Sequence, residues 1–208
     1  MKKRRQASGP NAEPLPLQAG WNRIAQSDIE DIKEFILTGY KDGAQFQPDD
    51  PQLIGSGYQL VLDFGCGLGR NFAPLNSVSN RVHAFDLPDM VEQCRLECTE
   101  SIDLLTADWS AIKRHKYDLI FAWLVVQHLD LPVLETYLKD WSTITTCLYL
   151  HTRCFLDDGG GNVLKTVLAS SLYDVGRCDI PVNEAMSLRK PSGTHFRALL
   201  RARESAGA

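Results

Sequence analysis

Residues 61–71, VLDFGCGLGRN, combine alternating glycines with a carboxylate, Asp63, in the apolar run before them. The glycines are Gly65, Gly67 and Gly69. Because glycine has no Cβ, a ligand can lie directly against such a backbone. The dinucleotide pattern G-x-G-x-x-G would need a further glycine where the chain has Arg70 or Phe72, and no P-loop Gly-Lys-Ser/Thr follows. The loop therefore predicts a nucleotide-like ligand of another kind.

Two further carboxylates and two histidines stand at or near the ends of expected strands. Asp86 ends AFD, 21 residues after the first of the three glycines, and Asp108 ends LLTAD. His128 follows the apolar stretch 117–127, and His151 lies near the end of CLYLHTRCF. Histidine is the commonest general base, although a lone histidine is more often a packing or hydrogen-bonding residue. Asp108 has a second interpretation, as the N-cap of a short helix at WSAIKR.

Strand-length apolar runs alternate with helical patterns along the chain. The expected strands are 58–65, 81–87, 102–108, 117–127, 147–155, 172–178 and 194–203, and the expected helices are 27–40, 87–100, 130–141 and 162–172. In 130–141, the apolar residues Leu134, Tyr137, Leu138 and Trp141 follow the spacing of an amphipathic helix. This alternation predicts an α/β fold, with a mostly parallel sheet and helices on both faces. In such folds the ligand crevice lies at the carboxyl ends of the strands.

Together these motifs resemble the class I S-adenosylmethionine-dependent methyltransferases. D-x-G-x-G-x-G is similar to their first motif, the acids at 86 and 108 end the second and third strands, and YDLIFAWLVVQHLD resembles their fourth-strand stretch. The likeness covers residues 58–131, and the closing pair LYDV and HFRALLRAR extends it to residue 203. It implies a seven-stranded, mostly parallel Rossmann-like sheet whose last strand is antiparallel, with S-adenosylmethionine as the cofactor.

The resemblance also implies which residues hold the cofactor. Asp86 would accept hydrogen bonds from both ribose hydroxyls, and Asp108 would receive the adenine amino group, with Trp109 close to the ring. Asp63 would order the loop and help to hold the cofactor's amino group, while Arg70 would pair with its carboxylate. A structural Asp63 and a solvated Arg70 stay open as alternatives. The expected cofactor-binding residues are Asp63, Gly65, Cys66, Gly67, Gly69, Arg70, Asp86, Leu87, Asp108, Trp109 and Trp123.

The acceptor side of the reaction is less specified. The cofactor's methyl group is already electrophilic, so a base is needed only if the acceptor must lose a proton. His128 and then His151 are the candidate catalytic residues. Metal-binding members of the family place glutamates beside the equivalent histidine, whereas Gln127 stands here, and Cys94 and Cys98 lack a nearby histidine pair for zinc. No metal is therefore expected.

The fourth-strand segment also separates branches of the family. Its DNA-modifying enzymes carry Asp/Asn-Pro-Pro-aromatic there, and this chain has AWLVVQ, which argues against a DNA substrate. LVVQHLDLP looks most like the small-molecule branch and predicts transfer to an oxygen or nitrogen of a small-molecule acceptor. Two alternatives remain: a non-catalytic S-adenosylmethionine-binding or S-adenosylhomocysteine-binding regulator, and an RNA or protein methyltransferase. A regulator would be indicated by a damaged motif, and none of the glycines or strand-end acids is missing.

Charge and composition limit the partners and the location. The chain has 22 Lys and Arg residues, of which four lie in segment 2–5, and 26 Asp and Glu residues, so the remainder carries a net charge of −8. Such a body is a poor general surface for nucleic acid. We expect residues 1–20 to be a disordered tail and 21–205 to be a single domain with a cap helix at about 27–40. An apolar run of membrane-spanning or signal-peptide length is missing, which predicts a cytoplasmic protein that does not bind membranes.

Overall fold

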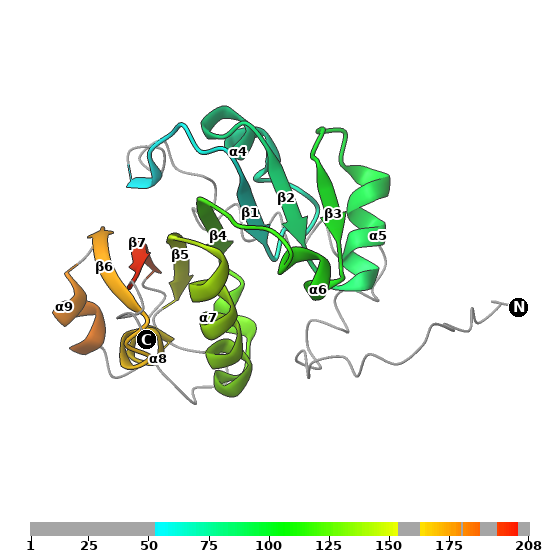
Figure 1. The fold of residues 1–208 in the computed structure, drawn as a ribbon. Helices are drawn as coiled ribbons and strands as arrows, with labels where there is room; N and C mark the ends of the chain where they lie inside the picture. Colours follow the sequence, from blue (N-terminus) through cyan, green and yellow to red (C-terminus); the bar gives the residue numbers. More distant parts are fainter. Residues whose placement is uncertain (1–52, 154–162, 180, 188–194, 204–208) are drawn as a thin grey trace, which may run out of the picture.

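The fold is seen in a computed structural model, which describes residues 53–153, 163–179, 181–187 and 195–203 (Figure 1). The strands are β1 Val61–Phe64, β2 Val82–Phe85, β3 Leu104–Thr106, β4 Leu119–Trp123, β5 Cys147–Arg153, β6 Tyr173–Cys178 and β7 His195–Ala202. The helices are α4 Phe72–Val78, α5 Pro88–Glu97, α6 Trp109–Ile112, α7 Leu131–Ile144, α8 Val163–Ala169 and α9 Val182–Ser187, and a 3-10 turn, η1, spans Val126–His128. Strands and helices alternate as the sequence predicts.

All seven strands belong to one sheet, in the order β3-β2-β1-β4-β5-β7-β6. Parallel pairing runs from β3 through β2, β1 and β4 to β5. β7 lies antiparallel between β5 and β6. The predicted seven-stranded, mostly parallel sheet with an antiparallel last strand is confirmed. The strand order reverses between β1 and β4, and in open α/β sheets ligands bind just beyond the carboxyl ends of the strands at that point.

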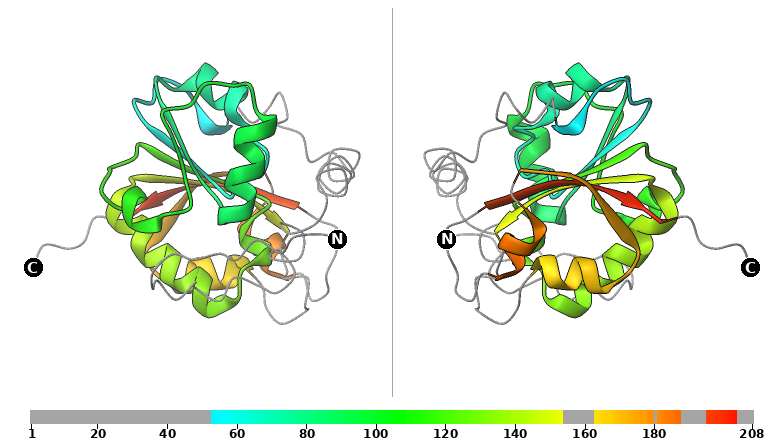
Figure 2. Two further views of the ribbon diagram at one scale, coloured as in Figure 1. Left: turned by 90° about the vertical axis from the view of Figure 1, so that its right-hand side faces the viewer. Right: turned by 90° about the vertical axis from the view of Figure 1, so that its left-hand side faces the viewer.

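Helices cover both faces of the sheet, and each face has its own apolar core. Figure 2 shows α7 and α8 on one side of the sheet and α4 on the other. Alternate side chains of β1, β4 and β5 pack with α6, α7, α8 and α9 on the first face and with α4 on the second. The predicted apolar face of α7 is buried, namely Leu134, Tyr137, Leu138 and Trp141. β4 is buried along its whole length, as expected for a central strand.

Two central strands are shorter than the apolar runs predict. β1 begins at Val61 because the N–H groups of Gln59 and Leu60 donate to the Asp118 carboxylate (2.7 and 3.0 Å). β4 ends at Trp123, and the residue after it has a φ of +54°, which turns the chain away from the sheet. The polypeptide then enters η1 rather than continuing as a strand.

Two short helices, α4 and α9, go beyond the sequence prediction, and a third, α6, is the short helix that the sequence leaves open as an alternative at WSAIKR. α4 follows the glycine loop, α6 follows β3, and α9 lies between the two closing strands. Each has seven or fewer residues, which is too short for a clear helical period. The predicted tail 1–20 and the predicted cap helix 27–40 lie outside the described residues, as do residues 154–162 and 188–194.

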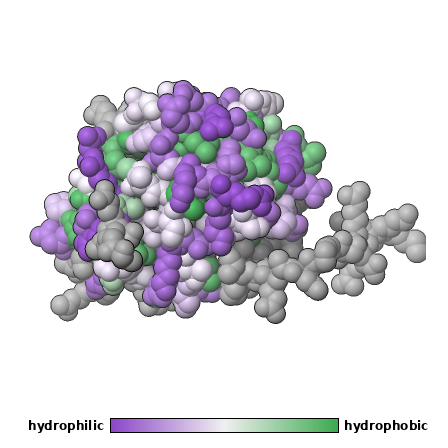
Figure 3. Space-filling view, viewed as in Figure 1, coloured by the Kyte–Doolittle hydropathy of each residue, from purple (hydrophilic) through white to green (hydrophobic). Residues whose placement is uncertain are grey.

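The surface carries few large apolar side chains. Hydrophobic and hydrophilic residues are interspersed on the face shown in Figure 3. Leu96, at 73% exposure, is the exposed large hydrophobic residue in the described part of the chain. None of the helices among the described residues is long and apolar enough to cross a membrane.

Candidate functional site

The candidate site lies where the chain leaves β1 at the carboxyl edge of the sheet. The glycine turn between β1 and α4 has φ values of +76°, +56° and +83° at Gly65, Gly67 and Gly69. L side chains rarely adopt these values, so the turn itself requires glycine. The Gly69 N–H donates to the Cys66 carbonyl (3.0 Å), and the Gly65 N–H donates to the Phe85 carbonyl of β2 (2.8 Å). The loop is therefore anchored to the end of the neighbouring strand.

Two of the three glycines also make room for the protein's own side chains. A Cβ on Gly65 would lie 2.4 Å from Val125 Cγ2. A Cβ on Gly69 would lie 2.6 Å from the Phe72 ring and 2.9 Å from Cys98 Sγ. Their lack of a side chain thus has a packing cause in addition to the predicted approach of a ligand. Val125, which ties the end of β4 to the loop, is a site residue that the sequence pattern does not reveal.

Asp86 directly follows β2 and accepts hydrogen bonds that hold the glycine loop. Its Oδ2 accepts a hydrogen bond from the Gly67 N–H, and its Oδ1 accepts one from the Leu87 N–H, both at 2.7 Å. Burial raises the pKa of Asp86 to about 6, although both N–H groups oppose the rise. A carboxylate has about four acceptor positions, so this half-buried group can take two further hydrogen bonds.

Asp63 is fully buried within β1. Neither of its oxygens has a hydrogen-bond partner within 3.5 Å among the described residues. Burial raises its pKa to about 8, and the nearby Asp86 adds to the rise, whereas the Arg70 guanidinium and the Asn71 side chain oppose it. A buried carboxyl without partners is costly, so this position fits a ligand that brings a positive charge or hydrogen-bond donors.

Cys66 and Leu87 border the same loop. Cys66 is buried, and its thiol lies 3.7 Å from the Gly67 carbonyl oxygen. Contact with the Cys94 thiol and burial raise the pKa of the Cys66 thiol, which keeps it protonated and unreactive. Leu87 is buried at the start of α5. The free thiols in the described ranges are Cys66, Cys94, Cys98, Cys147 and Cys178.

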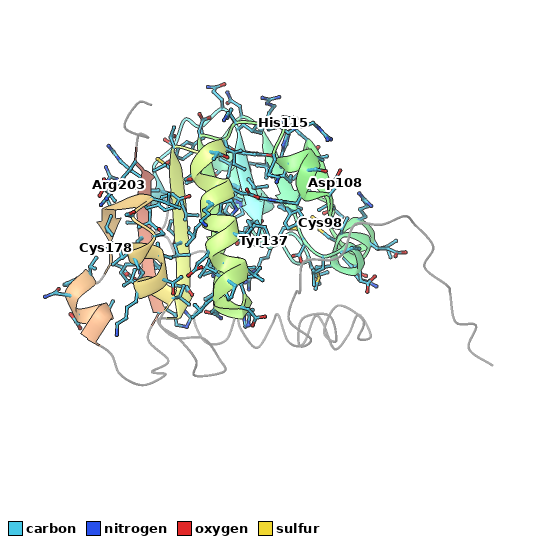
Figure 4. All side chains as sticks on the ribbon, turned by 60° about the horizontal axis from the view of Figure 1, so that its bottom comes forward. Cys98, Asp108, His115, Tyr137, Cys178 and Arg203 are labelled. Carbon is cyan, nitrogen blue, oxygen red and sulfur yellow. The ribbon has the colours of Figure 1, made fainter. Side chains whose placement is uncertain are left out.

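Asp108 and Trp109 have structural partners at the end of β3. Asp108 is the N-cap of α6, the alternative that the sequence leaves open, and its Oδ1 accepts from the Ser110 N–H (2.9 Å). The Ser110 hydroxyl lowers the pKa of Asp108. The Trp109 indole N–H donates to Asp140 of α7 (2.7 Å), and its ring lies edge-on to Tyr137. Figure 4 labels Asp108 at the start of α6 and Tyr137 on α7.

A second cluster occupies the carboxyl ends of β4 and β5. The Arg70 guanidinium carbon lies 5.5 Å from the centroid of the Trp123 ring. The His151 ring lies 5.2 Å from the same ring, tilted by 31°. His151 Nε2 is 2.9 Å from Nδ1 of His195, which belongs to β7. Burial lowers the pKa of His151 to about 3, and His195, Arg197 and Arg70 lower it further.

His128 lies apart from that pair, in η1. Its ring is half-buried, and its Nε2 is 3.1 Å from Nε2 of Gln127. The turn follows directly from Val125, whose side chain contacts the glycine loop. Both predicted histidines therefore lie beyond or at the carboxyl ends of central strands, but on different segments. Within the described ranges, no group of three or more His, Cys, Asp or Glu side chains is arranged to hold a metal ion.

Comparison with known proteins adds a sequence match over the central part of the chain. A family model described as a methyltransferase domain matches residues 61–146. This range begins at β1 and ends just before β5, so it includes the glycine loop, Asp86 and Asp108. A search of curated proteins finds no significant match.

Solved structures of methyltransferases share the fold. A TehB-like S-adenosylmethionine-dependent methyltransferase from Corynebacterium glutamicum has a TM-score of 0.59 at 17% identity, covering 84% of this chain and 97% of that one. The Synechocystis magnesium protoporphyrin IX methyltransferase, solved with bound S-adenosylmethionine, has a TM-score of 0.54 at 17% identity, covering 91% and 93%. Mitomycin 7-O-methyltransferase has a TM-score of 0.59 at 15% identity. The match covers 90% of this chain but only 62% of that enzyme.

Proposed function

We propose that the chain transfers the methyl group of S-adenosylmethionine to an oxygen or nitrogen of a small-molecule acceptor. The premise is the match of residues 61–146 to a methyltransferase-domain model, together with a fold shared with S-adenosylmethionine-dependent methyltransferases. The observation that carries the proposal is the pair of carboxyl groups beside the glycine loop. Asp86 holds the loop with two of its acceptor positions, and Asp63 is buried without a partner among the described residues.

The loop and its acids fit the cofactor group by group. Asp86 offers its remaining acceptor positions to the two ribose hydroxyls. Asp63 faces the α-ammonium group, whose positive charge would stabilise the ionised carboxylate. Arg70 pairs with the cofactor's carboxylate, and the bare backbone at Gly67 lets the ligand approach.

The remaining cofactor contacts are assigned to residues around this centre. Asp108 and Trp109 border the adenine, in addition to their structural roles in α6 and against α7. Cys66, Leu87 and Trp123 contribute apolar walls, because all three are buried at the ends of their strands or in the loop. Gly65 and Gly69 keep the turn in its shape and preserve its contacts with Val125 and Phe72.

The bound cofactor supplies a methyl group made electrophilic by the sulfonium charge. The chain's own task is to align the acceptor atom and to exclude water, which can account for several kcal/mol of the barrier. A protonated acceptor would need a base, and His128 in η1 is the residue that we propose for this role. Burial of His151, which lowers its pKa to about 3, makes it a weak base.

Small-molecule specificity is supported by the fourth-strand segment and the acidic body of the chain. AWLVVQ does not carry the motif of DNA-modifying relatives, and the net charge of −8 outside segment 2–5 disfavours nucleic acid. RNA or protein methylation and non-catalytic cofactor binding are the outcomes against which the proposal is tested.

The test follows both cofactor affinity and the destination of the methyl group. Purified protein is titrated with S-adenosylmethionine by calorimetry, and Asp86→Asn should weaken binding by about 10- to 100-fold because charge-assisted hydrogen bonds are lost. The matched control is Asp174→Asn, which alters the exposed ion pair between Asp174 of β6 and Arg203. Labelled cofactor is then incubated with metabolite, RNA and protein fractions. Label in RNA or protein, or saturable binding without transfer, would replace the small-molecule proposal.

A further inference from the structure

The histidine pair at the end of β5 has a buried polar atom without a hydrogen-bond partner in the described part of the chain. His151 is 2% exposed, and its Nδ1 has no hydrogen-bond partner among the described residues. Its other nitrogen, Nε2, lies 2.9 Å from His195 Nδ1. Buried polar atoms in folded proteins are nearly always hydrogen-bonded. A ligand that reaches Nδ1 would complete this site.

The charged groups around His151 indicate the sign of that ligand. Arg197 lies opposite His151 in the register of β5 and β7, and Arg70 reaches the neighbouring Trp123 ring. Both arginines lower the pKa of His151, and among the described residues no carboxylate acts against them on this histidine. Asp179 pairs with Arg197 (2.9 Å) and offsets part of its charge. In the proposed complex the cofactor's carboxylate shares Arg70 in the same way. The remaining positive charge favours an anion at His151 Nδ1 and disfavours an ammonium group.

A bound anion would also fix which ring nitrogens of His151 and His195 carry protons. The anion needs a hydrogen-bond donor, so His151 must carry its proton on Nδ1 when the ligand is bound. Its Nε2 then has a lone pair and must accept from His195, whose Nδ1 carries the proton. The 2.9 Å contact thus selects the tautomer of the buried ring.

We infer, on the premise of the proposed function, that the acceptor is an acid that binds as its oxygen anion. The Nδ1–H group of neutral His151 donates a hydrogen bond to this anion. His195 is the positioning residue, because its contact with Nε2 sets the tautomer of His151. Carboxylates and other acids ionised at neutral pH share this chemistry. The oxygen lone pair forms the new O–C bond while the S–C bond breaks, and the sulfur keeps the electron pair of that bond. One negative and one positive charge are cancelled, and no proton moves.

The first experiment identifies the charge class of the acceptor. A metabolite extract of the source organism is separated by ion exchange into acidic, neutral and basic pools, and each pool is incubated with the full chain and labelled S-adenosylmethionine. Label in the acidic pool, in methylated products that have lost a negative charge, is the expected result. Label only in the neutral or basic pool would overturn the inference and leave the proposed transfer standing. Label in no pool would remove the proposed function, and the inference with it.

The second experiment tests the tautomer through His195, with the purified acceptor from the acidic pool. His195→Asn places an amide nitrogen near the position of the imidazole Nδ1 and keeps a donor, so kcat/KM should stay within about threefold. His195→Leu removes the donor, and kcat/KM should fall by about 10- to 100-fold, the value of one hydrogen bond to a charged group. Nitrogen NMR of the wild type and the Asn variant should show His151 protonated at Nδ1.

His115→Gln is the matched control, because His115 precedes β4 at the opposite edge of the sheet and contacts His83 rather than the candidate site. Its kcat/KM should be unchanged. Denaturant unfolding of every variant separates a structural loss from a positioning role. Equal losses for the Asn and Leu variants, or His151 protonated at Nε2 in the acceptor complex, would contradict the assignment of His195.

Discussion

Replacing Asp63 by Asn should abolish most of the proton release that we expect when S-adenosylmethionine binds at pH 7. Burial raises the pKa of Asp63 to about 8, so about nine tenths of the molecules carry this proton at pH 7. The ammonium group of the cofactor would favour the ionised carboxylate. Binding should therefore release about 0.9 proton from Asp63 and about 0.1 from Asp86, whose pKa is about 6.

Calorimetry in two buffers with different ionisation enthalpies measures this release directly. In Asp63→Asn the release should fall to the share of Asp86, about 0.1 proton, and the affinity should drop by about 10- to 100-fold because one charge-assisted contact is lost. Asp174→Asn, at an exposed ion pair, should leave both quantities unchanged. If the Asn variant kept both the affinity and the full release, the ammonium could not lie against Asp63, and our reasoning on this site would be wrong.

Further predictions concern the stability of the fold. Gly65→Ala should lower the free energy of unfolding by about 2–5 kcal/mol, because its φ is +76° and its Cβ would lie 2.4 Å from Val125 Cγ2. Gly57→Ala, with a φ of +87° but nothing within 4 Å, should cost about 1–2 kcal/mol, and equal losses in urea denaturation would refute the packing argument. Burial lowers the pKa of His83 to about 4, below its unfolded value of 6.5. Neutral His83 therefore contributes fully to the free energy of unfolding above pH 6.5, and this contribution is lost as the pH falls toward 4. His83→Asn should remove this component, and parallel pH profiles of the two proteins would contradict it. Asp118→Ala should cost about 1–3 kcal/mol by removing the acceptor for two N–H groups before β1, whereas Asp118→Asn, which keeps an acceptor oxygen, should cost less in the same assay.

Much of the architecture could be predicted from the sequence because its causes are local. Alternating glycines after an apolar run specify the turn, since the φ values there suit glycine alone. The period of residues 130–141 specifies the buried face of α7. Asp86 could be placed beside the loop because parallel strands end at one edge of the sheet, and the hydrogen bond from Gly67 agrees with that placement.

Contacts between distant segments could not be read from local patterns. The pairing of His151 with His195 depends on β7 inserting beside β5, and the contact of Val125 with Gly65 depends on where β4 ends. Such contacts depend on how the whole chain packs, because they join residues that are far apart in the sequence. The short helices α4, α6 and α9 are explained in the same way, because packing rather than periodicity sets them.

The carboxyl group of Asp63 shows where the two kinds of information meet. The sequence alone determined that an acid stands two residues before the first glycine of the loop, and this was enough to suggest a ligand site. Only the tertiary structure decided that this acid is fully enclosed in the sheet, without a hydrogen-bond partner in the described part of the chain. Removal from water depends on every element packed around a residue, so the proton that Asp63 holds at neutral pH is a property of the folded chain.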